Sequence, residues 1–327
     1  MTDYPYMYAR VSAKRAKLLD TGDYENLVKM QPNEIARNLE EGDYREDINE
    51  LGARHEGVEL VELALNRNLS RTLTHLSEIA PPELEEVIET YLRKYELTSL
   101  KRLLRWKKSD RDIEIEDMLV TTGDICGEPI DELKEESFEE ILEAIRFKDS
   151  QVDYRDYIED PSDLREIEHA LDRAYYDELD ILSEKVESPR FRSFIRKELE
   201  YESLSTALRL KKYGYSYEQI EPYLVARNGS SLVEEVGHTE DIDRALEIVK
   251  SEKDVDGERL EDVEHALEVQ RLEKALTMLH TEPLGITSIL GYIVAKIIEV
   301  KNLRMLIRAK QTGIQNLETI RSNLVTA

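Results

Sequence analysis

One short motif occurs three times along the chain, at intervals of about a hundred residues. Each copy has a glutamate, then a small polar residue directly before an anchoring leucine, and the leucines are Leu100, Leu204 and Leu303. An arginine follows each leucine by five residues and a lysine by seven; the remaining positions are Glu96, Ser99, Arg105 and Lys107, then Glu200, Ser203, Arg209 and Lys211, then Glu299, Asn302, Arg308 and Lys310. The leucines are 104 and 99 residues apart, which exceeds the roughly 20–50 residues of solenoid repeats. This period indicates one domain-sized helical unit copied three times.

A second repeated segment lies upstream of the first and has the same period. Its copies begin at Glu62, Glu168 and Glu264, each followed by alanine after two residues and leucine after three. Apolar residues four and one before each glutamate, and eleven and fourteen after it, fall on one face of an α-helix. The distance from this glutamate to the anchoring leucine is 38, 36 and 39 residues in the three copies. Two motifs in one register predict three helical repeats, at residues 1–109, 110–213 and 214–327.

The composition predicts an all-α fold. Only 13 glycines and 9 prolines occur in 327 residues, and the alternation of apolar and polar residues typical of strands is nearly absent. We expect a helix over residues 8–19 that is broken at residues 20–23. The repeats adjoin without a Gly/Ser linker, and three similar units joined tightly are expected, by analogy with symmetric assemblies, to close into a funnel or cup.

The charge balance excludes one class of partner. The formal net charge is −26, from 45 basic and 71 acidic residues, and no basic block is present that could bind nucleic-acid phosphates. Two explanations remain open: adaptation to high intracellular salt, or an ordinary acidic subunit of a larger assembly. The apolar run at residues 284–300 carries Lys296 and Glu299 and is too short to span a bilayer. We therefore expect membrane contact only through protein partners.

Catalytic chemistry is not indicated by the sequence. Phosphate-binding glycine loops, zinc-protease motifs and nucleophile elbows are missing, and the single cysteine, Cys126, excludes a multi-thiolate metal site. We predict no catalytic residue, no cofactor and no metal. An all-α lyase or synthase with an acidic metal site is an alternative, for which Asp153 and Asp156 are the nearest candidates.

The repeated charged residues are the candidate functional positions. On an α-helix Glu96 lies about 40° and Lys107 about 20° from Leu100, on the apolar side, and the same holds in the other copies. These residues are predicted either to form ion pairs that orient the repeats or to contact a partner. The repeated arginines point about 140° away from the leucine, toward solvent or a neighbour. A broad apolar stripe near the C-terminus is expected to be core rather than a docking face: Ile286, Ile289, Leu290, Ile293, Ile297 and Ile298.

Together these motifs resemble a known family. Residues 299–304, followed by Ile307, Arg308, Ala309, Lys310 and Gly313, resemble the C-terminal signature of the C subunit of archaeal and bacterial A/V-type ATP synthases, the counterpart of the d subunit of vacuolar ATPases. Residues 8–11, 62–65, 91–94 and 170–176 are similar to other parts of that family. The family often has asparagine before the anchoring leucine, where this chain carries Ser99 and Ser203.

The resemblance implies a non-catalytic, all-helical funnel of three related domains. It implies partners in the proteolipid (c/K-type) ring and the central stalk, at the cytoplasmic face of the cell membrane, and rotation driven by H⁺ or Na⁺ flow. A helical-repeat scaffold or adaptor unrelated to the ATPase is the alternative function, although scaffolds of that kind have shorter repeats.

Overall fold

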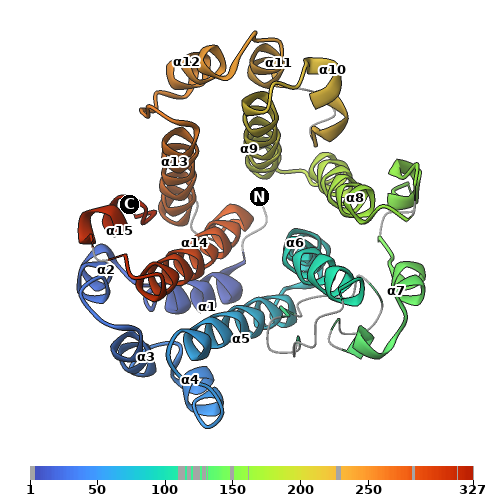
Figure 1. The fold of residues 1–327 in the computed structure, drawn as a ribbon. Coiled ribbons are helices and arrows are strands. Elements are labelled where there is room, and N and C mark those ends of the chain that lie inside the picture. Colours follow the sequence, from blue (N-terminus) through green and yellow to red (C-terminus); the bar gives the residue numbers. More distant parts are fainter. Residues whose placement is uncertain are drawn as a thin grey trace. The chain divides into compact units, whose positions relative to one another are not determined.

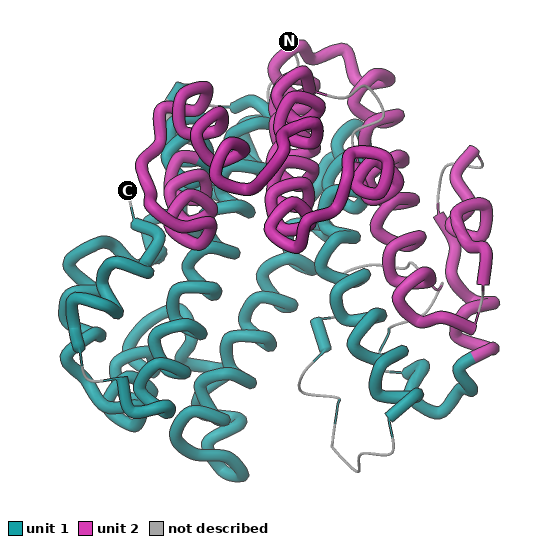
Figure 2. Tube along the Cα trace, turned by 45° about the horizontal axis from the view of Figure 1, so that its top comes forward, with its two compact units in different colours: residues 1–124, 128–138, 271–327 teal, residues 125–127, 139–270 magenta. Residues whose placement is uncertain are grey.

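The structure, a computed structural model, describes residues 4–109, 115, 119–120, 126, 130, 132–147, 151–160, 162–225, 230–281, 284–314 and 316–326. Within these residues the chain forms helices and no strand, so the prediction of an all-α fold is confirmed. Contacts between Cα atoms divide it into two compact units (Figure 2). Unit 1 contains residues 1–124, 128–138 and 271–327, and unit 2 contains residues 125–127 and 139–270.

Each of the repeated sequence segments forms one of a pair of consecutive long helices (Figure 1). The upstream segment forms a helix of 22 residues in all three copies, and the downstream segment forms one of 24 to 26 residues. The pairs are α5 (Gly57–Glu78) and α6 (Pro82–Lys107), α8 (Leu164–Lys185) and α9 (Pro189–Lys212), and α13 (Leu260–Thr281) and α14 (Ile286–Gln311). Pro82 and Pro189 start α6 and α9, where the missing N–H costs no helical hydrogen bond.

The remaining helices are shorter. In unit 1 they are α1 (Pro5–Arg15), α2 (Thr21–Leu27), α3 (Pro32–Glu40), α4 (Arg45–Leu51), η2 (Glu132–Glu135) and α15 (Leu317–Ser322). In unit 2 they are η3 (Tyr154–Tyr157), α10 (Tyr217–Ile220), η4 (Glu221–Tyr223), α11 (Ser231–Gly237) and α12 (Ile242–Lys253), while α7 (Phe138–Ala144) has its first residue in unit 1.

One expectation near the N-terminus was wrong. Residues 20–23 do not simply break a helix but also start α2, because Asp20 and Asp23 form a reciprocal capping box. The side chain of each accepts a hydrogen bond from the backbone N–H of the other at 2.9 Å. An aspartate before a short helix satisfies N–H groups that have no helical partner, so the polar run begins α2. The first helix, expected to continue to residue 19, already ends at Arg15.

The core of unit 1 is built around α14 and α5, which pack against each other, with α1 also on α14 and with α3 and α4 on α5. Ile286, Ile289, Leu290, Ile293 and Ile298 of the predicted C-terminal stripe are buried, and Ile297 is half-buried. The prediction that the stripe belongs to the core is therefore confirmed.

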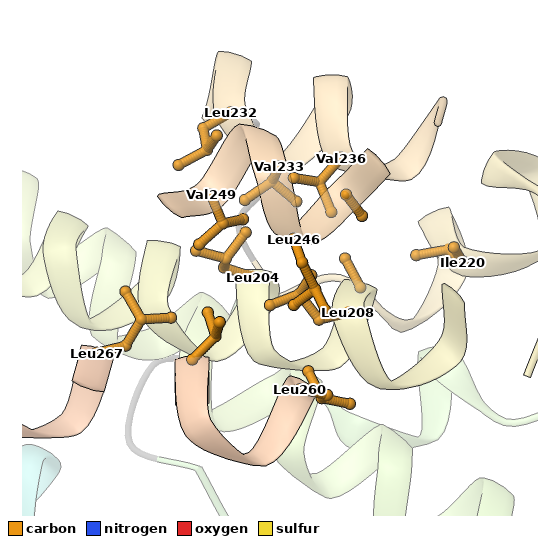
Figure 3. Close-up of a cluster of buried hydrophobic side chains, with 13 residues drawn as sticks. Leu204, Leu208, Ile220, Leu232, Val233, Val236, Leu246, Val249, Leu260 and Leu267 are labelled. Atoms are coloured by element: carbon orange, nitrogen blue, oxygen red, sulfur yellow. The ribbon is translucent and has the colours of Figure 1, made fainter. Parts of the chain in front are cut away.

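The core of unit 2 lies where α9 meets α11 and α12. Leu204 and Leu208 of α9 face Val233 and Val236 of α11 and Leu246 of α12 (Figure 3). The anchoring leucine of the second repeat therefore holds three helices together. The contact-based units cut α13 between residues 270 and 271, and the division into three repeats stays a prediction, as does their arrangement in a funnel.

Candidate functional site: the repeated motif

All three anchoring leucines are buried close to the C-terminal end of their helices. Leu100 and Leu303 are fully buried and Leu204 is 1% exposed. They lie seven or eight residues before the ends of α6, α9 and α14. Three leucines of one motif thus take the same place on three corresponding helices.

The small polar residue before each leucine receives a hydrogen bond from the backbone N–H of a valine some twenty residues later. Ser99 Oγ accepts from Val120 N at 2.7 Å, Ser203 Oγ accepts from Val225 N at 3.3 Å, and Asn302 Oδ1 accepts from Val325 N at 2.9 Å. Asn302 also donates through Nδ2 to the Val325 carbonyl oxygen at 2.8 Å. The position therefore ties the segment after each long helix back to that helix, and serine in place of asparagine keeps the acceptor but lacks the second donor.

The repeated lysines each donate to main-chain carbonyl groups. Lys107 contacts the carbonyl oxygen of Lys134, and Lys310 contacts that of Val28. Lys211, which is 5% exposed, donates to the carbonyl oxygens of Tyr215 and Thr239, both at 3.0 Å. A buried ammonium satisfied by carbonyl groups fixes loops to the helix end, and the three lysines make this kind of contact in three places.

Two of the repeated arginines pair with the repeated glutamates of the upstream helices. Arg209 Nε lies 2.7 Å from Glu264 Oε1, within unit 2, and Arg308 Nε contacts Glu62 Oε1, within unit 1. Both guanidinium groups are largely exposed, whereas the glutamates are mostly covered. Arg105 is exposed at the end of α6. Sequence reasoning placed these arginines toward solvent or a neighbour and did not name their partners, although the shared period of the glutamates was the available signal.

The repeated glutamates occupy three different environments. Glu96 is fully buried on α6. Glu200 is half-buried, 3.0 Å from Lys253 Nζ, and accepts a hydrogen bond from Ser230 Oγ at 2.8 Å. Glu299 is 4% exposed and belongs to the most elaborate of these networks.

Glu299 accepts hydrogen bonds from three directions. Leu19 N and Tyr44 Oη donate to it at 2.6 Å each, and Lys296 Nζ donates at 2.8 Å. Lys296 is 1% exposed, donates to Tyr44 Oη at 3.1 Å, and lies 4.3 Å from the centre of the Tyr44 ring. Burial, together with the Glu299 charge, raises the pKa of Tyr44 well above its usual value, so its hydroxyl stays a donor.

Asp43 stands at the edge of this network, 3.6 Å from Lys296 Nζ and 3.2 Å from Lys17 Nζ. Burial alone would raise the pKa of Asp43, but Lys296 and Lys17 together hold it below its usual range. The network therefore joins α14 to the segment after α1 and to the turn before α4. Sequence reasoning missed Tyr44, Lys296 and Asp43 as network members. Tyr44 and Asp43 lie outside the repeated motifs, but Lys296 stands three residues before Glu299, where the other two copies also carry a basic residue, and this was an available signal.

No group of three or more His, Cys, Asp or Glu side chains that could hold a metal ion occurs in the part of the chain that the structure describes. Asp153, the alternative metal candidate, caps η3 and accepts a hydrogen bond from Arg155 N at 3.0 Å. Among the same residues no helix is long and apolar enough to cross a membrane.

These features define an all-helical protein in which the side chains of a recurring motif bind helices and loops of the same chain. The family model described as "ATP synthase (C/AC39) subunit" matches residues 7–322. The C subunit of the A-type ATP synthase of Methanococcoides burtonii is 35% identical, over 99% of this chain and 94% of its own. The corresponding C subunits from Haloquadratum walsbyi and Haloferax volcanii are 31% and 30% identical, over 96% and 94% of both chains respectively.

The chain therefore belongs to the ATP synthase (C/AC39) subunit family, as the sequence resemblance indicated. It is a non-catalytic subunit of an archaeal ATP synthase, and its partners are other subunits of that complex. This membership decides against both alternatives, the unrelated helical scaffold and the all-α lyase.

Proposed function

We propose that the chain connects the membrane rotor to the central stalk of an A-type ATP synthase. One face would bind the proteolipid (c/K-type) ring and another the central-stalk subunits, so that H⁺ or Na⁺ flow turns both together. The observation that carries the proposal is the family match over residues 7–322, combined with a motif whose charges serve to hold the chain together.

A connecting subunit transmits torque only if it does not deform under load. Close-packed interiors have low compressibility and pass strain on. The motif supports this requirement, because Lys211 fixes two loop carbonyls to α9 and Asn302 fixes the C-terminal segment to α14. The buried pair of Lys296 and Glu299 likewise fixes the N-terminal segment to α14.

The proposed place is the cytoplasmic face of the cell membrane, with the protein held there through its partners. We also propose that residues 1–109, 110–213 and 214–327 are three related domains. The equivalent hydrogen bonds at Ser99, Ser203 and Asn302 support this division.

Loss of the subunit should separate two activities that are normally linked. In complex assembled without this chain, ATP hydrolysis by the catalytic head should continue, while ion pumping and gradient-driven ATP synthesis stop. Adding the purified chain back should restore pumping. Undiminished pumping without the chain would show that torque does not pass through it.

A milder test reverses the charge of the repeated arginines. The triple variant Arg105→Glu, Arg209→Glu and Arg308→Glu should assemble less well if these positions face partners, and more so at low salt, where exposed charges are least screened. Circular dichroism of the isolated variant controls for folding. Normal assembly and pumping across a salt series would show that the arginines do not contact partners and that their contacts lie within the chain.

A further inference from the structure

One pocket of unit 1 with a charged lining lies between the end of α1, the turn before α4, and residues of α4 and α5. Its volume is about 1020 Å³. Every residue that lines it, except Gly42, is polar or charged. Small-molecule sites are mostly apolar and enclose their ligand, so this lining favours a polypeptide that brings charged side chains of its own.

The acidic side chains of the pocket are already paired. Three of the four have a cation beside them, Lys17 at Asp43, Arg71 at Glu46 and Arg67 at Glu50, and Glu78 lies 3.7 Å from the imidazole of His75. Arg71 also holds the buried carboxylate of Asp47 at 2.8 Å. Most of the negative charges in the pocket are therefore compensated from within unit 1.

Two cations remain after this pairing. Among the described residues, neither the half-buried Lys14 of α1 nor the exposed Arg45 at the start of α4 makes a side-chain hydrogen bond or ion pair. In a chain of net charge −26, two cations without an ion-pair partner in one pocket form a local site for anions.

We propose that this pocket binds an acidic polypeptide segment of another chain, which places one carboxylate on Lys14 and a second on Arg45. The ligand does not depend on the rotor-linking role. A free phosphate would fill only a small part of the volume, and the two cations come from separate helices. A segment with carboxylates several residues apart fits both facts.

The electrostatics of Lys14 agree with this ligand. Burial lowers the pKa of Lys14, and the neighbouring Lys17, Lys296 and Arg71 lower it further, against the attraction of Asp43. The surroundings of Lys14 thus disfavour its charged ammonium form. An incoming carboxylate would compensate that charge and make binding stronger.

The test uses the full chain and a fluorescein-labelled peptide of ten glutamates, measured by fluorescence anisotropy at about 0.15 M salt, where the Debye length is about 8 Å. Overall repulsion between two acidic molecules works against non-specific binding. The double variant Lys14→Gln/Arg45→Gln should bind about tenfold more weakly, as expected for the loss of two partly exposed charge pairs. Glu46→Gln, which removes an acid from the pocket, should bind more tightly than the unaltered chain.

The matched control is Lys29→Gln/Arg37→Gln. Both residues are exposed on unit 1 and lie outside the pocket. Their replacement removes the same amount of positive charge as the replacement of Lys14 and Arg45. The control should bind within about twofold of the unaltered chain. The proposal is overturned if the peptide does not bind, or if both double variants lose affinity equally. Displacement of the peptide by tripolyphosphate at equal charge would also overturn it, by identifying the pocket as a phosphate site.

Discussion

At the scale of single residues, the buried ammonium of Lys296 has the largest energetic consequence. Removing one member of a buried, hydrogen-bonded charge pair leaves the other uncompensated and costs about 3–5 kcal/mol. We expect Lys296→Met to lower the free energy of unfolding of the isolated chain by about 3 kcal/mol, measured by urea denaturation. The double variant Lys296→Met/Glu299→Gln should recover part of this loss, because it removes the uncompensated negative charge and the amide oxygen can still accept from Tyr44, although the amide NH2 cannot accept from Leu19 N. A single variant as stable as the unaltered chain would contradict the buried pair.

The same network shows which residues can be predicted from sequence. Glu299 was a candidate because its motif recurs, and its place on the apolar side indicated an internal charge. Lys296 was not a candidate, although the position three residues before the motif glutamate is basic in all three copies, as Arg93, Lys197 and Lys296. Tyr44 has no such counterpart and is separated from Lys296 by 252 residues. Side chains that meet only through tertiary packing carry no local signal.

At the scale of helices, the pair of Arg308 and Glu62 joins α14 to α5. Exposed ion pairs contribute about 0.2–1 kcal/mol, so a double-mutant cycle with Arg308→Ala and Glu62→Ala should give a coupling energy in that range, smaller at 1 M salt. Arg308→Ala combined with Glu59→Ala, on the same α5, is the control and should be additive. A coupling no larger than that of the control would show that the pair does not join the helices.

Helix positions were predictable because two motifs shared one period and one apolar stripe each, which fixed both the long helices and the buried leucines. The start of α2 was not predicted. The polar run at residues 20–23 is typical of a break, and only the reciprocal hydrogen bonds of Asp20 and Asp23 show that it also begins a helix. The same residue types stop one helix and cap the next, so sequence alone distinguishes these roles poorly.

At the scale of the whole molecule, the dominant property is the formal net charge of −26. The structure compensates acids locally, as at Glu264 and Glu62, but 45 basic residues cannot pair with 71 acidic ones. The excess repels itself in the compact state more than in the expanded unfolded chain. Salt concentration therefore acts on the stability of the fold as a whole rather than on one contact.

If the acidic excess is an adaptation to salt, the melting temperature of the isolated chain should rise as KCl increases from 0.01 M to 1 M. The Debye length falls from roughly 30 Å to about 3 Å over that range, so repulsion between distant carboxylates is largely screened. Exposed pairs such as Arg209 with Glu264 are weakened by the same salt, but each contributes little, and the net effect should be stabilising. Differential scanning calorimetry at each KCl concentration measures the melting temperature. A parallel series in choline chloride at equal ionic strength separates screening from specific K⁺ binding. A melting temperature that stays constant would instead favour an acidic surface that serves contacts within the assembled ATP synthase.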